Sequence, residues 1–173
     1  MSANSKNFIK NYFLQKMLDT RLFFFKEAIT LTDFLGELFR VKKILVILPI
    51  DRVEEVEARK FLPEIQSVFK GAKVSTLDLS SLRNYDTNWL GVPNHKYLTN
   101  IRQENFELLM DLNGHHDRIC CYLGALTEAP LRIHATEGKF DKVYNLHFRG
   151  AEGASLQDRY RNMLNYMRNI RGQ

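Results

Sequence analysis

The segment at residues 113–117 carries the side chains of this chain that are best suited to chemistry. It reads Asn-Gly-His-His-Asp, holds two of the chain's five histidines, and directly follows an apolar run that contains Asp111. Imidazole can act as a general acid or base near neutral pH, or as a metal ligand. Open α/β sheets also bind ligands in the segments that follow their strands. We therefore expect Asp111, Asn113, His115 and His116 to form a ligand or partner surface.

The two adjacent histidines allow three interpretations. Metal binding needs three or four ligands, and neighbouring side chains point in divergent directions, so His134 and His147 could complete a set only if strand ends converge. Acid–base catalysis would need a nucleophile near His115 or His116, and none is evident. The third interpretation is a polar turn that performs no chemistry and contacts a partner. We adopt it, and expect no metal, no cofactor and no catalytic residue.

Trp89 is the only tryptophan of the chain and lies in a polar, turn-rich stretch at residues 80–95. It either anchors this long loop or is exposed as a binding hot spot, since tryptophan is enriched among such residues. We add Trp89 to the expected ligand or partner surface.

Alternating strands and helices must position these side chains. Such an alternation is typical of a parallel sheet with right-handed crossovers. In the predicted helix at 53–69, Pro63 is expected to cause a kink or to mark the true helix boundary. Val53 and Val56 are expected to face inward. The predicted fold is α/β and Rossmann-like, with a mostly parallel sheet and flanking helices. The predicted strands are 44–48, 73–79, 107–112, 131–134 and 144–148, and the predicted helices are 53–69, 118–127 and 156–170.

The first 40 residues have the periodicity of amphipathic helices, with a second short helix from Asp33 to Phe39. Two interpretations stay open: these helices pack on the domain, or they form an arm that contacts a membrane or a larger assembly. We predict an amphipathic, basic helical arm at residues 1–41 and an α/β domain at residues 42–173. The arm's expected membrane or partner contacts are Phe8, Tyr12, Phe13, Lys6, Lys10 and Lys16.

Basic residues are concentrated at the two ends of the chain. Residues 1–43 hold eight Lys/Arg and four Asp/Glu, residues 155–173 hold four and one, and the middle holds 13 and 15. Basic ends suit acidic protein surfaces or an anionic membrane. No nucleic-acid-binding motif is present, so nucleic acid is not an expected partner. We expect no secretory signal, and we interpret the adjacent Cys120 and Cys121 as reduced packing residues. Both expectations favour a cytoplasmic protein.

Part of the α/β body follows a familiar pattern. A lysine-led strand precedes a helix with an internal Leu62-Pro63, and a second strand follows the turn Lys-Gly-Ala-Lys. The strand Phe-Glu-Leu-Leu-Met-Asp-Leu-Asn then leads through a small helix to Ala-Pro-Leu-Arg-Ile at residues 129–133. Over residues 42–148 this pattern resembles the N-terminal half of the heptosyltransferase-like glycosyltransferases, family 9 of that class. The resemblance implies one of two Rossmann-like domains.

The resemblance also implies features that we do not expect in this chain. Enzymes of that family hold the sugar nucleotide in a C-terminal domain, and we expect no such domain here, because 173 residues leave no room for it. Their first strand leads into a Ser-x-Gly-Asp turn with the catalytic base, whereas residues 48–57 here contain neither serine nor glycine. Counting forward from the strand places the catalytic base at Glu54, whereas counting back from Leu62-Pro63 places it at Glu57. Because the two positions disagree, we assign the base to neither residue.

These observations favour a non-catalytic accessory or linker subunit that binds other proteins with acidic surfaces. We expect it in a membrane-associated assembly, for example a photosynthetic or other energy-transducing complex, with peripheral contact at the cytoplasmic membrane face. The alternative is an acceptor-binding domain of a heptosyltransferase-like glycosyltransferase that works with a separate donor-binding domain.

Overall fold

The structure is built on one sheet of five parallel strands in the order β2-β1-β3-β4-β5. The computed structural model describes residues 3–24, 33–82, 86–88, 92–148 and 153–172. The predicted α/β, Rossmann-like class is confirmed, and all four strand pairings are parallel. The strands are β1 (Lys43–Ile47), β2 (Lys73–Leu77), β3 (Leu108–Asp111), β4 (Leu131–His134) and β5 (Leu146–His147).

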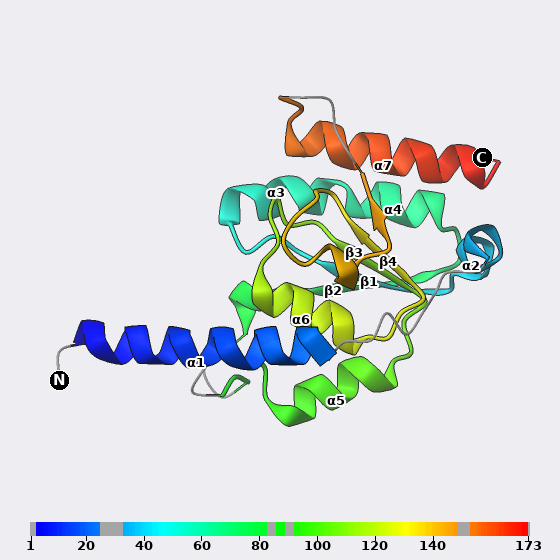
Figure 1. Ribbon diagram of the computed structural model, residues 1–173. Coiled ribbons are helices and arrows are strands. Elements are labelled where there is room, and N and C mark those ends of the chain that lie inside the picture. Colours follow the sequence, from blue (N-terminus) through cyan, green and yellow to red (C-terminus); the bar gives the residue numbers. More distant parts are fainter. Residues whose placement is uncertain (1–2, 25–32, 83–85, 89–91, 149–152, 173) are drawn as a thin grey trace.

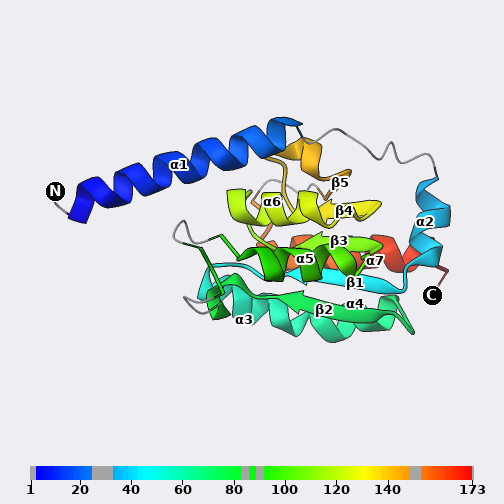
Figure 2. The same cartoon turned by 90° about the horizontal axis from the view of Figure 1, so that it is seen from below.

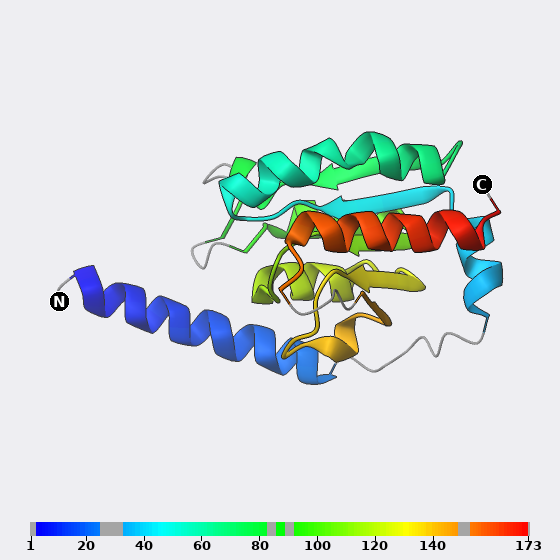
Figure 3. The same cartoon turned by 90° about the horizontal axis from the view of Figure 1, so that it is seen from above.

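Helices cover both faces of the sheet (Figure 1). Helices α3, α4 and α7 lie on one face, and α5, α6 and part of α1 lie on the other, as the view from above also shows (Figure 3). The helices are α1 (Ala3–Phe24), α2 (Phe34–Arg40), α3 (Arg52–Lys60), α4 (Leu62–Val68), α5 (His95–Gln103), α6 (Arg118–Leu126) and α7 (Leu156–Ile170), with short 3₁₀ helices η1 (Leu79–Ser81) and η2 (Asp141–Val143).

Two apolar cores result, one on each face of the sheet. In β1, Ile44 and Val46 belong to the core under α4 and α7, whereas Leu45 and Ile47 belong to the core under α5 and α6. Successive side chains of a strand point to opposite faces, so a central strand buried on both must be apolar throughout. This requirement explains why the continuous apolar run at 44–48 predicts the strand.

The register of the sheet aligns the last residues of three strands. Asp111 of β3 is paired with His134 of β4, and His134 is paired with His147 of β5. Three ionisable side chains therefore stand in a row at the carboxyl ends of neighbouring strands. This row organises the polar site described below.

The predicted helix at 53–69 is two helices, and Pro63 marks the boundary as expected. Pro63 lies in the first turn of α4, where its missing N–H leaves no hydrogen bond unmade. The predicted inward orientation of Val53 and Val56 is wrong, because these side chains are 76% and 57% exposed. The break at Phe61 lets α3 pack through Ala58 with its own orientation.

Local hydrogen bonds explain the starts of two other helices. The Asp33 carboxylate accepts from Gly36 N at 2.8 Å, which confirms the predicted start of α2. The sequence does not predict helix α5, because the polar residues around Asn94 favour a long turn. The Asn94 side chain instead accepts from Tyr97 N at 3.0 Å and caps α5.

Candidate functional site

Asp111 lies at the centre of a buried polar cluster at the carboxyl ends of β3 and β4. Its carboxylate accepts from Tyr144 Oη at 2.5 Å, from Asn113 N at 3.0 Å and from Asn113 Nδ2 at 2.7 Å. Burial, followed by the charge of Asp111, raises the pKa of Tyr144 well above its ordinary value. Tyr144 therefore stays protonated and remains a donor. Asp111 and Asn113, each 1% exposed, present no surface to a partner in this arrangement.

Asn113 also helps to close the crevice between β1 and β3, where the strand order reverses. Strands β2 and β3 flank β1 on opposite sides, so the crevice between the ends of β1 and β3 is the usual ligand position of such a sheet. Here Asn113 Oδ1 accepts from Ile50 N at 3.0 Å, and Glu54 Oε2 accepts from Gly114 N at 3.3 Å. The contact is close, since a Cβ on Gly114 would lie 2.8 Å from the Glu54 carboxylate. The chain's own side chains thus bridge the crevice.

The adjacent histidines diverge, as the sequence predicts. His115 is exposed, whereas the His116 side chain is only 2% exposed. Phe140 N donates to His116 Nδ1 at 3.2 Å, which places the ring proton on Nε2. Nε2 then donates to Thr136 O at 3.1 Å. His116 is therefore held by the segment that connects β4 to β5.

His134 is fully buried beside Asp111. His134 Nδ1 accepts from Thr136 N at 3.0 Å and also lies 3.0 Å from Thr136 O. The other ring nitrogen, Nε2, lies 3.8 Å from Asp111 Oδ2 and has no hydrogen-bond partner among the described residues. Burial lowers the pKa of His134 to about 4, which keeps the ring neutral at pH 7.

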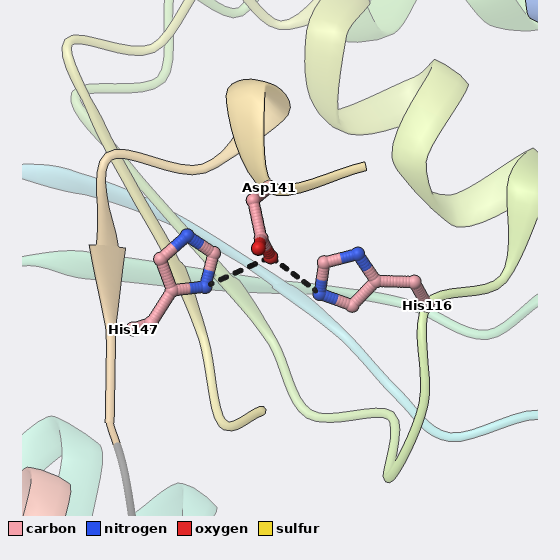
Figure 4. A group of neighbouring side chains, drawn as sticks. All are labelled: His116, Asp141 and His147. Atoms are coloured by element: carbon pink, nitrogen blue, oxygen red, sulfur yellow. Dashed lines mark ion pairs between the residues drawn. The ribbon is translucent and has the colours of Figure 1, made fainter. Parts of the chain in front are cut away.

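Beside the strand ends, His147 and His116 meet Asp141, a residue that the sequence does not predict at this site. His147 Nδ1 and His116 Nε2 each lie 3.7 Å from Asp141 Oδ1, and both rings point toward that carboxylate (Figure 4). Asp141 is the first residue of η2 and could not be placed from sequence. The sequence does indicate that histidines gather at this edge of the sheet, because predicted strands 131–134 and 144–148 each contain a histidine at or near the end.

The two cysteines are packing residues rather than nucleophiles. Cys120 and Cys121 are free and buried on α6, where they join the core beneath that helix. Burial raises the pKa of both thiols, so neither forms a thiolate near neutral pH.

The expected arm residues lie on α1. Phe8, Tyr12 and Phe13 are exposed, Lys10 is partly buried, and Lys16 Nζ lies 5.9 Å from the centre of the Tyr12 ring. The side chain of Lys6 and the whole of Trp89 lie outside the described parts of the chain, so the predictions for them stay untested.

Among the side chains of α1 that the structure describes, those buried against the body lie in the second half of the helix. Leu18 and Leu22 are buried in the core beneath α6, and Leu14 and Met17 pack against it. Figure 2 shows the first half of α1 extending past α6 and away from the sheet. Packing on the domain is therefore shown for the second half of α1, and the contacts of the first half stay a prediction.

None of the helices in the described ranges has the combination of length and apolar character needed to cross a membrane. Comparison of the chain with protein-family models, with curated proteins and with solved structures gives no match.

Proposed function

We propose that this chain is a non-catalytic accessory subunit that binds other protein subunits through the first half of α1. The observation that carries this proposal is the exposure of three aromatic side chains there: Phe8 is 73% exposed, Tyr12 54% and Phe13 55%. Neighbouring exposed aromatic residues are typical of binding surfaces, where such side chains supply much of the affinity.

The charge near these rings favours a partner with an acidic surface. Lys10 lies between these aromatic residues, Lys16 Nζ lies 5.9 Å from the centre of the Tyr12 ring, and residues 1–43 carry twice as many basic as acidic residues. Opposite charge across an interface speeds association and selects partners. The same side chains would also suit an anionic membrane, so the test must separate these two surfaces.

The bridged crevice between β1 and β3 supports a role without catalysis. A substrate at this position would have to displace the Asn113 amide from Ile50 N and the Glu54 carboxylate from Gly114 N. Breaking these contacts would leave backbone donors to be satisfied by the ligand. A binding role for α1 makes no such demand.

The test compares three forms of the chain at native abundance in cells. One carries Phe8→Ser, Tyr12→Ser and Phe13→Ser. The matched control carries Val53→Ser and Val56→Ser, which remove exposed apolar side chains from a different helix. Wild type and control should elute within a larger assembly on size exclusion, with cross-links from α1 to other proteins. The triple variant should elute near 20.3 kDa with an unchanged circular dichroism spectrum.

Three outcomes would contradict the proposal. A wild-type chain recovered only as a monomer would remove the subunit role. Flotation of wild type, but not of the triple variant, with vesicles of anionic lipid would assign α1 to a membrane surface instead. Micromolar binding of a sugar nucleotide would show that the chain has a working substrate site and would contradict the non-catalytic role.

A further inference from the structure

Three possible metal ligands meet between the turn after β3, η2 and β5. They are His116 Nε2, Asp141 Oδ1 and His147 Nδ1, and all three atoms lie within 4.8 Å of one another. Each comes from a different segment, and Figure 4 shows the two rings directed at the Asp141 carboxylate from opposite sides. We propose that these three side chains bind a divalent transition-metal ion, with zinc as the best fit.

The spacing suits a shared ion better than direct hydrogen bonds. Each histidine nitrogen lies 3.7 Å from Asp141 Oδ1, which is too long for a hydrogen bond. Two ligands of a tetrahedral zinc ion with bonds of about 2.0–2.1 Å are about 3.3–3.4 Å apart. Small movements of the two rings and of the exposed carboxylate would therefore complete the site.

A backbone oxygen is placed to supply a fourth ligand. Thr136 O lies 3.1 Å from His116 Nε2 and 3.3 Å from His147 Nδ1. These distances and the two of 3.7 Å bracket the edge of the tetrahedron. Two imidazoles with one carboxylate are typical zinc ligands, whereas calcium and magnesium prefer sites made of oxygen alone.

The surrounding backbone holds the ligands in place. Gly138 N donates to Asp141 Oδ1 at 2.7 Å and so orients the carboxylate. Gly138 also packs against the His116 ring, since a Cβ on this glycine would lie 2.7 Å from His116 Cγ. Arg132 Nε donates to Val143 O at 2.5 Å and ties the end of η2 to β4. Such supporting contacts are characteristic of metal sites.

Access and protonation are consistent with reversible binding. The Asp141 side chain is 49% exposed and His147 is 19% exposed, so an ion can enter from solvent without opening the core. In the described arrangement, His116 Nε2 and His147 Nδ1 each donate to Thr136 O. The metal-bound form carries each ring proton on the other nitrogen of the same ring, and His116 gives up its bond from Phe140 N.

His134 is not one of the ligands. Its Nδ1 accepts from Thr136 N, and its Nε2 faces Asp111 inside the core. Its ring packs against His116 with centroids 4.2 Å apart and limits the movement of that ligand.

The test is titration of the chelator-treated full chain with zinc by calorimetry and with cobalt by visible absorption. Asp141→Asn and His147→Gln remove ligands that are partly exposed, so these variants should fold. His115→Gln is the matched control, because His115 is exposed beside His116. Wild type and control should bind one equivalent, and cobalt should give the intense bands of tetrahedral coordination. Each ligand variant should bind at least ten-fold more weakly, with an unchanged circular dichroism spectrum.

Several results would overturn this site, and none depends on the proposed role of α1. The wild-type chain could fail to bind one equivalent of zinc. The affinity could be the same in Asp141→Asn and His147→Gln as in wild type. Finally, His115→Gln could lose as much affinity as the ligand variants, which would indicate a different set of ligands.

Discussion

The buried His134 should make this fold sensitive to mild acid well before its carboxylates titrate. Its ring is 0% exposed, and burial lowers its pKa to about 4, against about 6.5 for an unfolded histidine. Between these two values the unfolded chain binds a proton that the folded chain does not. Stability is therefore fully present above pH 6.5 and is lost as the pH falls toward 4.

The size of the effect follows from the difference between the two pKa values. One pKa unit corresponds to about 1.4 kcal/mol, so His134 alone should remove about 2 kcal/mol of unfolding free energy by pH 5 and about 3 kcal/mol by pH 4. For a domain of ordinary stability this is a large fraction of the total.

The assay is urea denaturation at pH 7, 6 and 5 in the presence of a metal chelator. His134→Gln cannot titrate, so its stability should fall less with acid, and the difference from wild type should change by about 2 kcal/mol between pH 7 and 5. His95→Gln, at the exposed start of α5, should keep the wild-type pH dependence. Parallel curves for wild type and His134→Gln would refute this account of the buried ring.

Three further predictions, each measured by urea denaturation, test separate parts of the structure. Tyr144→Phe leaves the buried Asp111 carboxylate without its 2.5 Å donor and should cost about 2 kcal/mol; no measurable loss would show that this bond adds nothing to stability. Asp117→Ala removes the side chain that caps α6 through Ile119 N and Cys120 N and should cost about 1 kcal/mol, while Asp117→Ser should retain most of the stability. Leu22→Ala should cost about 2–4 kcal/mol because this side chain is 1% exposed, whereas Phe23→Ala, 75% exposed, should change stability by less than about 0.5 kcal/mol; equal losses would contradict the docking of only one face of α1.

The sheet could be predicted from sequence because its strands carry their own signal. The run at 44–48 is apolar at every position, as expected of a strand or helix that is buried on all sides. Its short length favours a strand. The boundary at Pro63 was predictable for a similar reason, since proline cannot donate within a helix. These features depend on a few neighbouring residues and need no knowledge of the rest of the fold.

The features that were missed depend on contacts between distant residues. Whether Val53 faces inward is decided by how α3 packs after the break at Phe61, and a helical pattern cannot specify that orientation. Asp141 lies in a connection with no periodic pattern, so its approach to His116 depends on the path of the chain between β4 and β5. Helix α5 has a local cap at Asn94, but the surrounding polar residues favoured a turn.

The parallel register explains why the polar cluster could be anticipated in outline and not in detail. Once β3, β4 and β5 are adjacent, their last residues must lie side by side, so Asp111, His134 and His147 form a row whatever the loops do. The loops then divide this row. Tyr144 and Asn113 enclose Asp111 in the core, whereas Asp141 reaches His147 at the surface. One row of strand ends thus leads to a buried network, which stabilises the fold, and to the partly exposed group of His116, Asp141 and His147, which we propose as metal ligands.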